Sequence, residues 1–100
     1  MKPPYYAVIF TSKRTPQDTG YAETAARMVA LAKEQDGFLG MESARNELGI
    51  TVSYWASLDA IQAWKENVAH RLAQEKGRET WYAEYTIRIA KVEKEYRWQK

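Results

Sequence analysis

The chain of 100 residues contains no cysteine and a single histidine. The absence of cysteine excludes disulfides, thiolate nucleophiles and cysteine-ligated zinc or iron–sulfur sites, and it fits a reducing compartment. One histidine cannot form a multi-histidine metal site, and the sequence has no Gly-rich phosphate loop, nucleophile-elbow serine or HExxH motif. The sequence therefore predicts a domain that folds by apolar burial alone and binds no metal.

Long apolar runs and charge of one sign are also lacking. The longest apolar run, Tyr5–Phe10, is far shorter than the roughly 20 residues of a membrane span. The prolines before this run and the charged residues after it argue against a signal peptide. The net charge of +2 is carried by the last ten residues, which is too little for a nucleic-acid surface of clustered Lys and Arg. We expect a cytoplasmic protein that binds neither membranes nor nucleic acid.

Aromatic residues are abundant, since 13% of the chain is Phe, Trp or Tyr. A chain of this length forms one core, and a small interior has little room for so many large rings. We expect a single domain over residues 1–100, with a core of about 5–93 and with aromatic side chains left for a pocket or an interface. Residues 94–100 form a basic tail that carries Tyr96 and Trp98, and we expect this tail to contact a partner subunit.

Side-chain periodicity predicts four strands and two helices. The β-branched and aromatic segments predict strands over Tyr5–Ser12, Phe38–Arg45, Ile50–Trp55 and Trp81–Val92. In the last strand, period-two alternation predicts a buried face of Trp81, Ala83, Tyr85, Ile87 and Ile89.

Capping signals predict where the helices begin and end. The first helix is expected to begin near Thr15, with Pro16 at its first position, and to end at Gly37. The second is expected to begin after the N-cap Ser57 and to end at Gly77, and its apolar stripe is Leu58, Ile61, Trp64, Val68 and Leu72.

This order of elements predicts an α+β, ferredoxin-like βαββαβ fold with a four-stranded antiparallel sheet and two helices on one face. The third strand, Ile50–Trp55, lacks the basic, glycine and aromatic pattern of an RNA-binding domain that shares this order. Two helices leave the other sheet face uncovered. We therefore expect a homodimer through the open face.

The second helix carries the candidates for catalysis. Trp64, Asn67 and His70 follow one another in steps of three. In a straight helix each step drifts about 60° around the axis, which leaves His70 in solvent. If the helix breaks near Asn67, all three side chains can face one cavity. Both interpretations of His70 remain open, whereas the place of Trp64 on the apolar stripe favours the core over a catalytic role.

Further candidates lie on the strands. Phe10, Tyr54, Tyr85 and Trp81 are predicted to form the apolar walls of a substrate pocket. Arg45 and Arg88 could neutralise an anionic ligand, but a lone arginine on a strand is more often an exposed charge, so we interpret both as such.

Several stretches of the chain carry a family resemblance: Asp36–Ser43, Ile50–Trp55, Ser57–Ile61, Ala63 and Trp64 with His70, and Trp81 with Tyr82. With the order of elements, they resemble the antibiotic biosynthesis monooxygenase (ABM) family of small dimeric α+β barrel proteins, over roughly residues 5–95. The resemblance implies a dimer of packed sheets in which each subunit has a cavity between its sheet and its helices.

The resemblance also implies chemistry. Characterised relatives oxygenate phenolic or quinol-like aromatics with molecular oxygen and without metal or flavin. Trp64 and Asn67 match positions near the substrate, and His70 is the nearest base. Haem-degrading relatives use an Asn, a Trp and a His, of which this chain retains only Trp64, because Gln74 stands at the histidine position. Haem is therefore disfavoured as a ligand.

Three functions follow from this sequence. The leading prediction is a cofactor-independent monooxygenase that acts on a small electron-rich aromatic, with His70 as base and Asn67 and Trp64 as hydrogen-bond donors. The second is a binding protein of the same fold that carries a small ligand or haem without converting it. The third is a purely structural dimer module.

Overall fold

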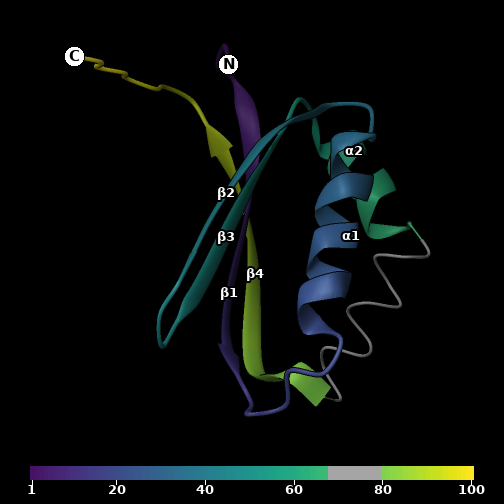
Figure 1. Ribbon diagram of the computed structural model, residues 1–100. Helices are drawn as coiled ribbons and strands as arrows, with labels where there is room; N and C mark the ends of the chain where they lie inside the picture. Colours follow the sequence, from purple (N-terminus) through teal and green to yellow (C-terminus); the bar gives the residue numbers. More distant parts are fainter. Residues whose placement is uncertain (68–79) are drawn as a thin grey trace.

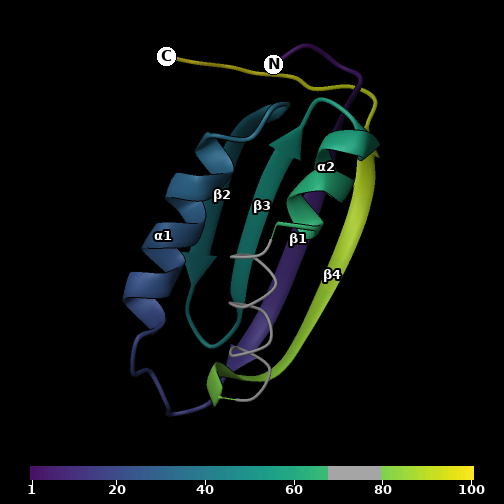
Figure 2. The ribbon, with the colours of Figure 1, turned by 90° about the vertical axis from the view of Figure 1, so that its right-hand side faces the viewer.

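The structure, a computed structural model, describes residues 1–67 and 80–100. Its elements are β1 (Tyr5–Arg14), α1 (Tyr21–Lys33), β2 (Phe38–Arg45), β3 (Gly49–Trp55), α2 (Leu58–Lys65) and β4 (Tyr82–Val92). The strands pair antiparallel in the order β2-β3-β1-β4, which is the split βαβ arrangement. Both helices lie on one face of the sheet (Figures 1 and 2). The predicted ferredoxin-like α+β fold is confirmed.

The first helix begins later than its capping signals predict. α1 begins at Tyr21, with Gly20 as N-cap in the left-handed conformation that glycine adopts without steric cost. Thr15 is not a cap. Its N–H donates to the Trp81 carbonyl at 2.8 Å, and its hydroxyl donates to the Thr80 carbonyl at 2.6 Å. The predicted start is wrong because these hydrogen bonds hold Thr15 against the start of β4.

The end of α1 also differs from the prediction. The helix ends at Lys33 with Glu34 as C-cap, three residues before Gly37. Gly37 has a φ of +84° and turns the chain into β2. A Cβ on Gly37 would lie 2.7 Å from the Cβ of Ala60 on α2. Glycine is therefore required for the turn and for the approach of α2, and not for the helix cap.

The second helix begins as predicted. The Ser57 hydroxyl accepts the Ala60 N–H at 3.0 Å, so Ser57 is the N-cap. α2 ends at Lys65 with Glu66 as C-cap, and the predicted continuation to Gly77 falls largely on residues 68–79, outside the described residues.

The predicted apolar stripe of α2 is only partly buried. Ile61 and Trp64 are buried, whereas Leu58 is 53% exposed, contrary to the prediction. Leu58 lies about 90° around the helix from the centre of the face that Ile61 and Trp64 share. In a helix as short as α2, that offset directs Leu58 to solvent.

The start of β4 is irregular. Trp81 is buried just before the strand, and its Nε1–H donates to the Thr19 carbonyl at 3.0 Å. The pairing of β1 with β4 shifts register between Lys13 and Arg14. Ala83 is exposed as a result, contrary to the prediction, and Tyr82 takes its place on the helix side of the sheet.

The core joins both helices to one end of the sheet. It consists of the buried residues Ala32, Trp55, Ile61 and Trp64. The Trp55 and Trp64 rings stack with centroids 5.9 Å apart, and Trp55 Nε1 donates to the Ser53 hydroxyl at 2.9 Å. The indole N–H of Trp55 is thus satisfied within the core, as a fully buried donor requires.

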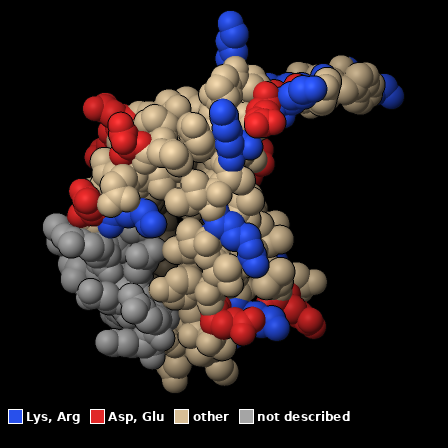
Figure 3. All heavy atoms as spheres, turned by 180° about the vertical axis from the view of Figure 1, so that it is seen from behind, with Lys and Arg blue, Asp and Glu red and all other residues tan. Residues whose placement is uncertain are grey.

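The opposite face of the sheet has no described helix over it (Figure 1). Ile9 pairs with Val52, and the neighbouring Ile50 is 41% exposed. The C-terminal residues after Val92 leave the body on this side, and their Tyr96 and Trp98 are 90% and 81% exposed. Positive and negative side chains are interspersed over the surface in Figure 3. Within the described residues, no helix combines the length and apolarity of a membrane span.

Gly37, just before β2, and Gly40, within it, provide a test of this packing. We expect Gly37→Ala to lower the free energy of unfolding by about 1–3 kcal/mol, because alanine is strained at positive φ and its methyl overlaps Ala60. Gly40→Ala is the matched control, because its Cβ meets nothing closer than Tyr54 at 4.0 Å, and it should change stability by less than about 0.5 kcal/mol. Chemical denaturation measures both. Equal losses in the free energy of unfolding of the two variants would contradict a specific requirement for glycine at position 37.

Candidate functional site

A cavity of about 210 Å³ lies between the sheet and the helices. Its floor follows from the helix-facing residues of β3, which are Gly49, Thr51, Ser53 and Trp55 because side chains alternate along a strand. Thr51 and Ser53 are small and leave space below the helices, Arg45 occupies the space over Gly49, and Trp55 fills the space at the far end. The cavity thus arises from a change of side-chain size along one strand.

The helices form the roof of the cavity. α1 contributes Thr24, Ala25, Met28 and Val29, and α2 contributes Ile61, Trp64 and Lys65. Ala32 is the one fully buried residue of α1, whereas Thr24, Ala25, Met28 and Val29 lie above the cavity and are only half-buried.

One end of the cavity is a cluster of five aromatic rings. Phe10 stacks on Tyr85 at 5.4 Å between centroids, and Tyr82 meets Phe10, Tyr85 and Tyr21 edge-on. Tyr21 also meets Trp81 edge-on at 5.5 Å. These are favourable geometries for aromatic pairs. The walls are therefore flat, apolar surfaces suited to a planar ligand.

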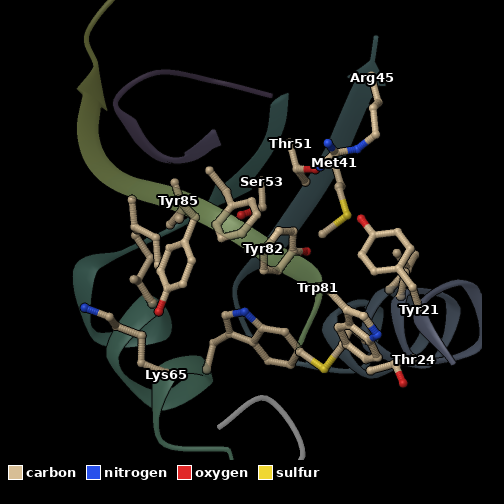
Figure 4. A pocket seen from close by; sticks show the side chains of 18 of the residues that line it. Tyr21, Thr24, Met41, Arg45, Thr51, Ser53, Lys65, Trp81, Tyr82 and Tyr85 are labelled. Atoms are coloured by element: carbon tan, nitrogen blue, oxygen red, sulfur yellow. The ribbon is translucent and has the colours of Figure 1, made fainter. Parts of the chain in front are cut away.

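Polar groups are few, and the charged ones lie at the edges of the cavity. Figure 4 shows Lys65 and Tyr85 at one side and Arg45 and Tyr21 at the other. Burial raises the pKa of Tyr82, and its hydrogen bond to Tyr21 raises that pKa further. The Tyr82 hydroxyl consequently stays protonated at neutral pH. No described lining residue is acidic, and the described residues include no group of three metal-binding side chains.

Four of the predicted site residues line this cavity: Phe10, Trp64, Trp81 and Tyr85. Tyr54 does not, so its prediction as a wall of this cavity is wrong. Trp55 faces the helices, and strand alternation therefore places Tyr54 on the opposite face. There its hydroxyl donates to Glu42 Oε2 at 3.1 Å, and its ring meets Tyr5 edge-on.

Two candidates from the sequence remain, Asn67 and His70, and the structure describes only Asn67. α2 ends just before Asn67, whose N–H donates to the Trp64 carbonyl at 3.1 Å. The helix thus ends where a break was considered from the sequence. Asn67 is half-buried and is not among the described lining residues, while His70 lies outside the described residues. The catalytic roles of Asn67, His70 and Trp64 stay predictions.

Sequence reasoning missed several lining residues, notably Tyr21, Tyr82 and Ser53. Arg45 is exposed, as the sequence predicts, and it also lines the cavity. A signal for the cavity existed in the alternate small residues of Gly49–Trp55. No comparable signal existed for Tyr82, because it reaches the cavity through the register shift at the end of β1.

A model of the antibiotic biosynthesis monooxygenase family matches residues 4–76. The chain belongs to this family. As an ABM protein it is also similar in sequence to YqjZ of Bacillus subtilis (strain 168), described as an uncharacterized protein. The two are 56% identical over 96 residues, which cover 94% of this chain and 84% of YqjZ.

Solved structures share the fold of this ABM protein. A variant of SnoaB, a cofactor-independent oxygenase from Streptomyces nogalater, has a TM-score of 0.79 at 11% identity, over 93% of this chain and 97% of SnoaB. A conserved protein from Methanosarcina mazei Go1 has a TM-score of 0.77 at 10% identity, over 87% and 91% of the two chains. At sequence identities this low, the structural similarity shows a shared fold and nothing further.

The environment of Tyr82 predicts how the protein responds to alkali. The pKa of Tyr82 is raised in the folded protein, whereas an unfolded tyrosine ionises near pH 10. The stability linked to Tyr82 is therefore present below about pH 10 and falls as the pH rises further. When tyrosinate absorbance is followed as the pH is raised, the ionisation of Tyr82 should appear as a late step at high pH. We expect Tyr82→Phe to remove this step. Tyr96→Phe, in the exposed tail, should keep that step; loss of the late step in this control alone would refute the assignment.

Proposed function

We propose that the protein is a cofactor-independent oxygenase that acts on a small electron-rich aromatic of the phenol or quinol type. The observation that carries this proposal is the cavity of about 210 Å³ with aromatic walls between sheet and helices. Membership of the ABM family and the fold shared with SnoaB support it. We propose that neither metal, flavin nor haem takes part.

The reaction we propose needs no external reductant. A base removes the phenolic proton, and the electron-rich ring then transfers electrons to molecular oxygen. One oxygen atom bonds to a ring carbon that carries hydrogen, and the other leaves as water, so that a phenol is converted to a quinone. The substrate supplies all the electrons. The protein supplies an apolar cavity that holds substrate and oxygen together, a base, and donors to the phenolate oxygen.

The residues assigned to these roles are those that the sequence suggested. We assign His70 as the base, because imidazole titrates near neutral pH. We assign Asn67 and Trp64 as groups that hold the phenolate oxygen. Phe10, Tyr85 and Trp81 provide apolar walls, and the location of Trp64 on the cavity wall is consistent with its assigned place beside the substrate.

Oxygen consumption with a panel of phenols and quinols tests the proposal. We expect turnover above background for at least one compound, with one atom of ¹⁸O₂ in the quinone and one in water. His70→Ala should lower kcat by about 10²-fold or more, as expected for loss of a general base. Leu58→Ala is the control, because Leu58 is exposed and does not line the cavity.

Other results of this experiment would reject the oxygenase. A compound that raises the melting temperature but gives no product would instead favour a binding protein. A shift of the Soret band of added haem that is lost in His70→Ala would favour haem binding. If no compound binds or reacts, the assembly module remains as the function.

We also propose that two chains form a homodimer through the open face of the sheet, as is typical of the ABM family. The apolar side chains Ile9, Ile50 and Val52 on that face support this arrangement. The tail of residues 94–100 extends on the same side of the sheet, with Tyr96 and Trp98 exposed. We assign the tail to contact with the partner subunit.

Sedimentation at micromolar concentration tests the dimer. We expect Ile50→Glu to weaken association by about 100-fold or more, because the two-fold axis buries the new carboxylate twice. Leu58→Glu introduces the same charge on the helix side and should leave the dimer intact. A monomeric unmodified protein would refute the proposal. Deletion of residues 94–100 should weaken the dimer if the tail contacts the partner.

A further inference from the structure

One row of cross-strand neighbours crosses the sheet beneath the end of the cavity. It contains Arg45 on β2, Gly49 on β3, Ser12 on β1 and Tyr85 on β4. Arg45 lies across Gly49, and its Nη2 donates to the Ser12 hydroxyl at 2.6 Å. Ser12 is buried, so this hydrogen bond holds one end of the guanidinium against the sheet, while Arg45 as a whole stays exposed.

Gly49 makes this conformation of Arg45 sterically accessible. A Cβ on Gly49 would overlap the Arg45 guanidinium. The backbone of Gly49 does not itself require glycine, since its φ is not in the left-handed region. The missing side chain therefore provides space for Arg45 to reach Ser12.

Hydrogen-bond donors converge beside this guanidinium. Figure 4 shows Arg45, Tyr21 and Thr51 at the same side of the cavity, with Tyr82 between them and the aromatic walls. The Ser12 hydrogen bond engages only one guanidinium nitrogen, and arginine has five N–H donors. The described part of the lining contributes no carboxylate that would compete for them.

This end of the cavity is also open to a ligand. A second hollow adjoins it, and Tyr21, Arg45 and Thr51 line both. Arg45 therefore lies at the mouth, where its charge is partly solvated and its attraction for an anion is moderate.

We propose that Arg45, with the hydroxyls of Tyr21 and Thr51, forms a carboxylate-binding subsite, so that the preferred ligand is a planar aromatic acid. The ring lies along Phe10, Tyr82 and Tyr85, and the carboxylate lies at the mouth. Arginine and hydroxyl donors arranged at one edge suit a carboxylate, which accepts several hydrogen bonds in one plane. This inference names a substrate class and rests on the proposed function.

Lys65 offers a second positive charge at the opposite side of the cavity (Figure 4). It is exposed at the end of α2, and no hydrogen bond in the described residues fixes its ammonium. A flexible ammonium gives less directional recognition than a guanidinium held in place. The subsite is therefore assigned to Arg45, and the two cations can be compared by substitution.

The preference for acid over neutral ligand tests the subsite. The probes are 3-hydroxy-2-naphthoate and 2-naphthol, titrated into the full-length protein by calorimetry at pH 7. We expect the acid to bind at least about tenfold more tightly than the naphthol. Added salt should weaken the binding of the acid and leave the binding of the naphthol unchanged. Arg45→Gln should abolish the preference for the acid. Lys65→Gln should retain most of this preference, and Lys33→Gln, which lies outside the cavity, should retain all of it.

Gly49→Ala separates the position of Arg45 from its charge. The added methyl displaces the guanidinium while every charge is kept, so we expect a loss of preference similar to that in Arg45→Gln. Gly40→Ala is the control. Circular dichroism checks the fold of each variant, and Arg45→Lys, with an intermediate preference, provides a second measurement if Arg45→Gln fails to fold.

Several results would overturn the subsite. These are equal binding of acid and naphthol, no binding of either probe, retention of the preference in Arg45→Gln, or its loss in Lys65→Gln instead. Oxygen uptake with neutral quinols tests the oxygenase separately. An oxygenase without acid preference would refute the subsite alone, and acid preference without oxygen uptake would refute the oxygenase alone.

Discussion

The size of the helix-facing side chains on β3 is the constraint on which the rest of the structure depends. Thr51 and Ser53 leave a hollow below the helices, Arg45 occupies the space over Gly49, and Trp55 closes the other end. If these positions held large residues, the helices would rest on a filled layer, as in a close-packed interior. The space persists because the apolar contacts that stabilise the fold are concentrated at the Trp55 end.

Large aromatic rings compensate for the small side chains on the floor of the cavity. Trp64 stacks on Trp55 in the core and also lines the cavity, so one ring contributes to stability and to the ligand-facing wall. At the opposite end, Arg14 lies 3.5 Å above the Tyr21 ring and strengthens the edge-on cluster through a cation–π contact. Because the walls are packed against neighbouring rings, they are held in position before a ligand enters, which lowers the entropy lost on binding.

Local pattern was sufficient to predict the order of elements, the Ser57 cap and the burial of Ile61 and Trp64. Prediction failed where distant contacts decide the outcome. Thr15 follows the pattern of a cap, yet its hydrogen bonds go to residues near β4. Tyr82 reaches the cavity through a register shift, and Tyr54 lies on the face opposite to the predicted one. Arg45 belongs to the cavity because of Gly49 and Ser12, two residues on other strands.

The shallow packing of α1 has a consequence for molecular motion. Ala32 is its one fully buried residue, and its packing is anchored by Tyr21 at one end and by Met28 and Leu31 against the Trp55 core. Elements with little buried surface open at a lower free energy than the core does. Within α1, the half-buried Thr24, Ala25 and Val29 above the cavity are therefore the residues we expect to open at a lower free energy than the Trp55 core.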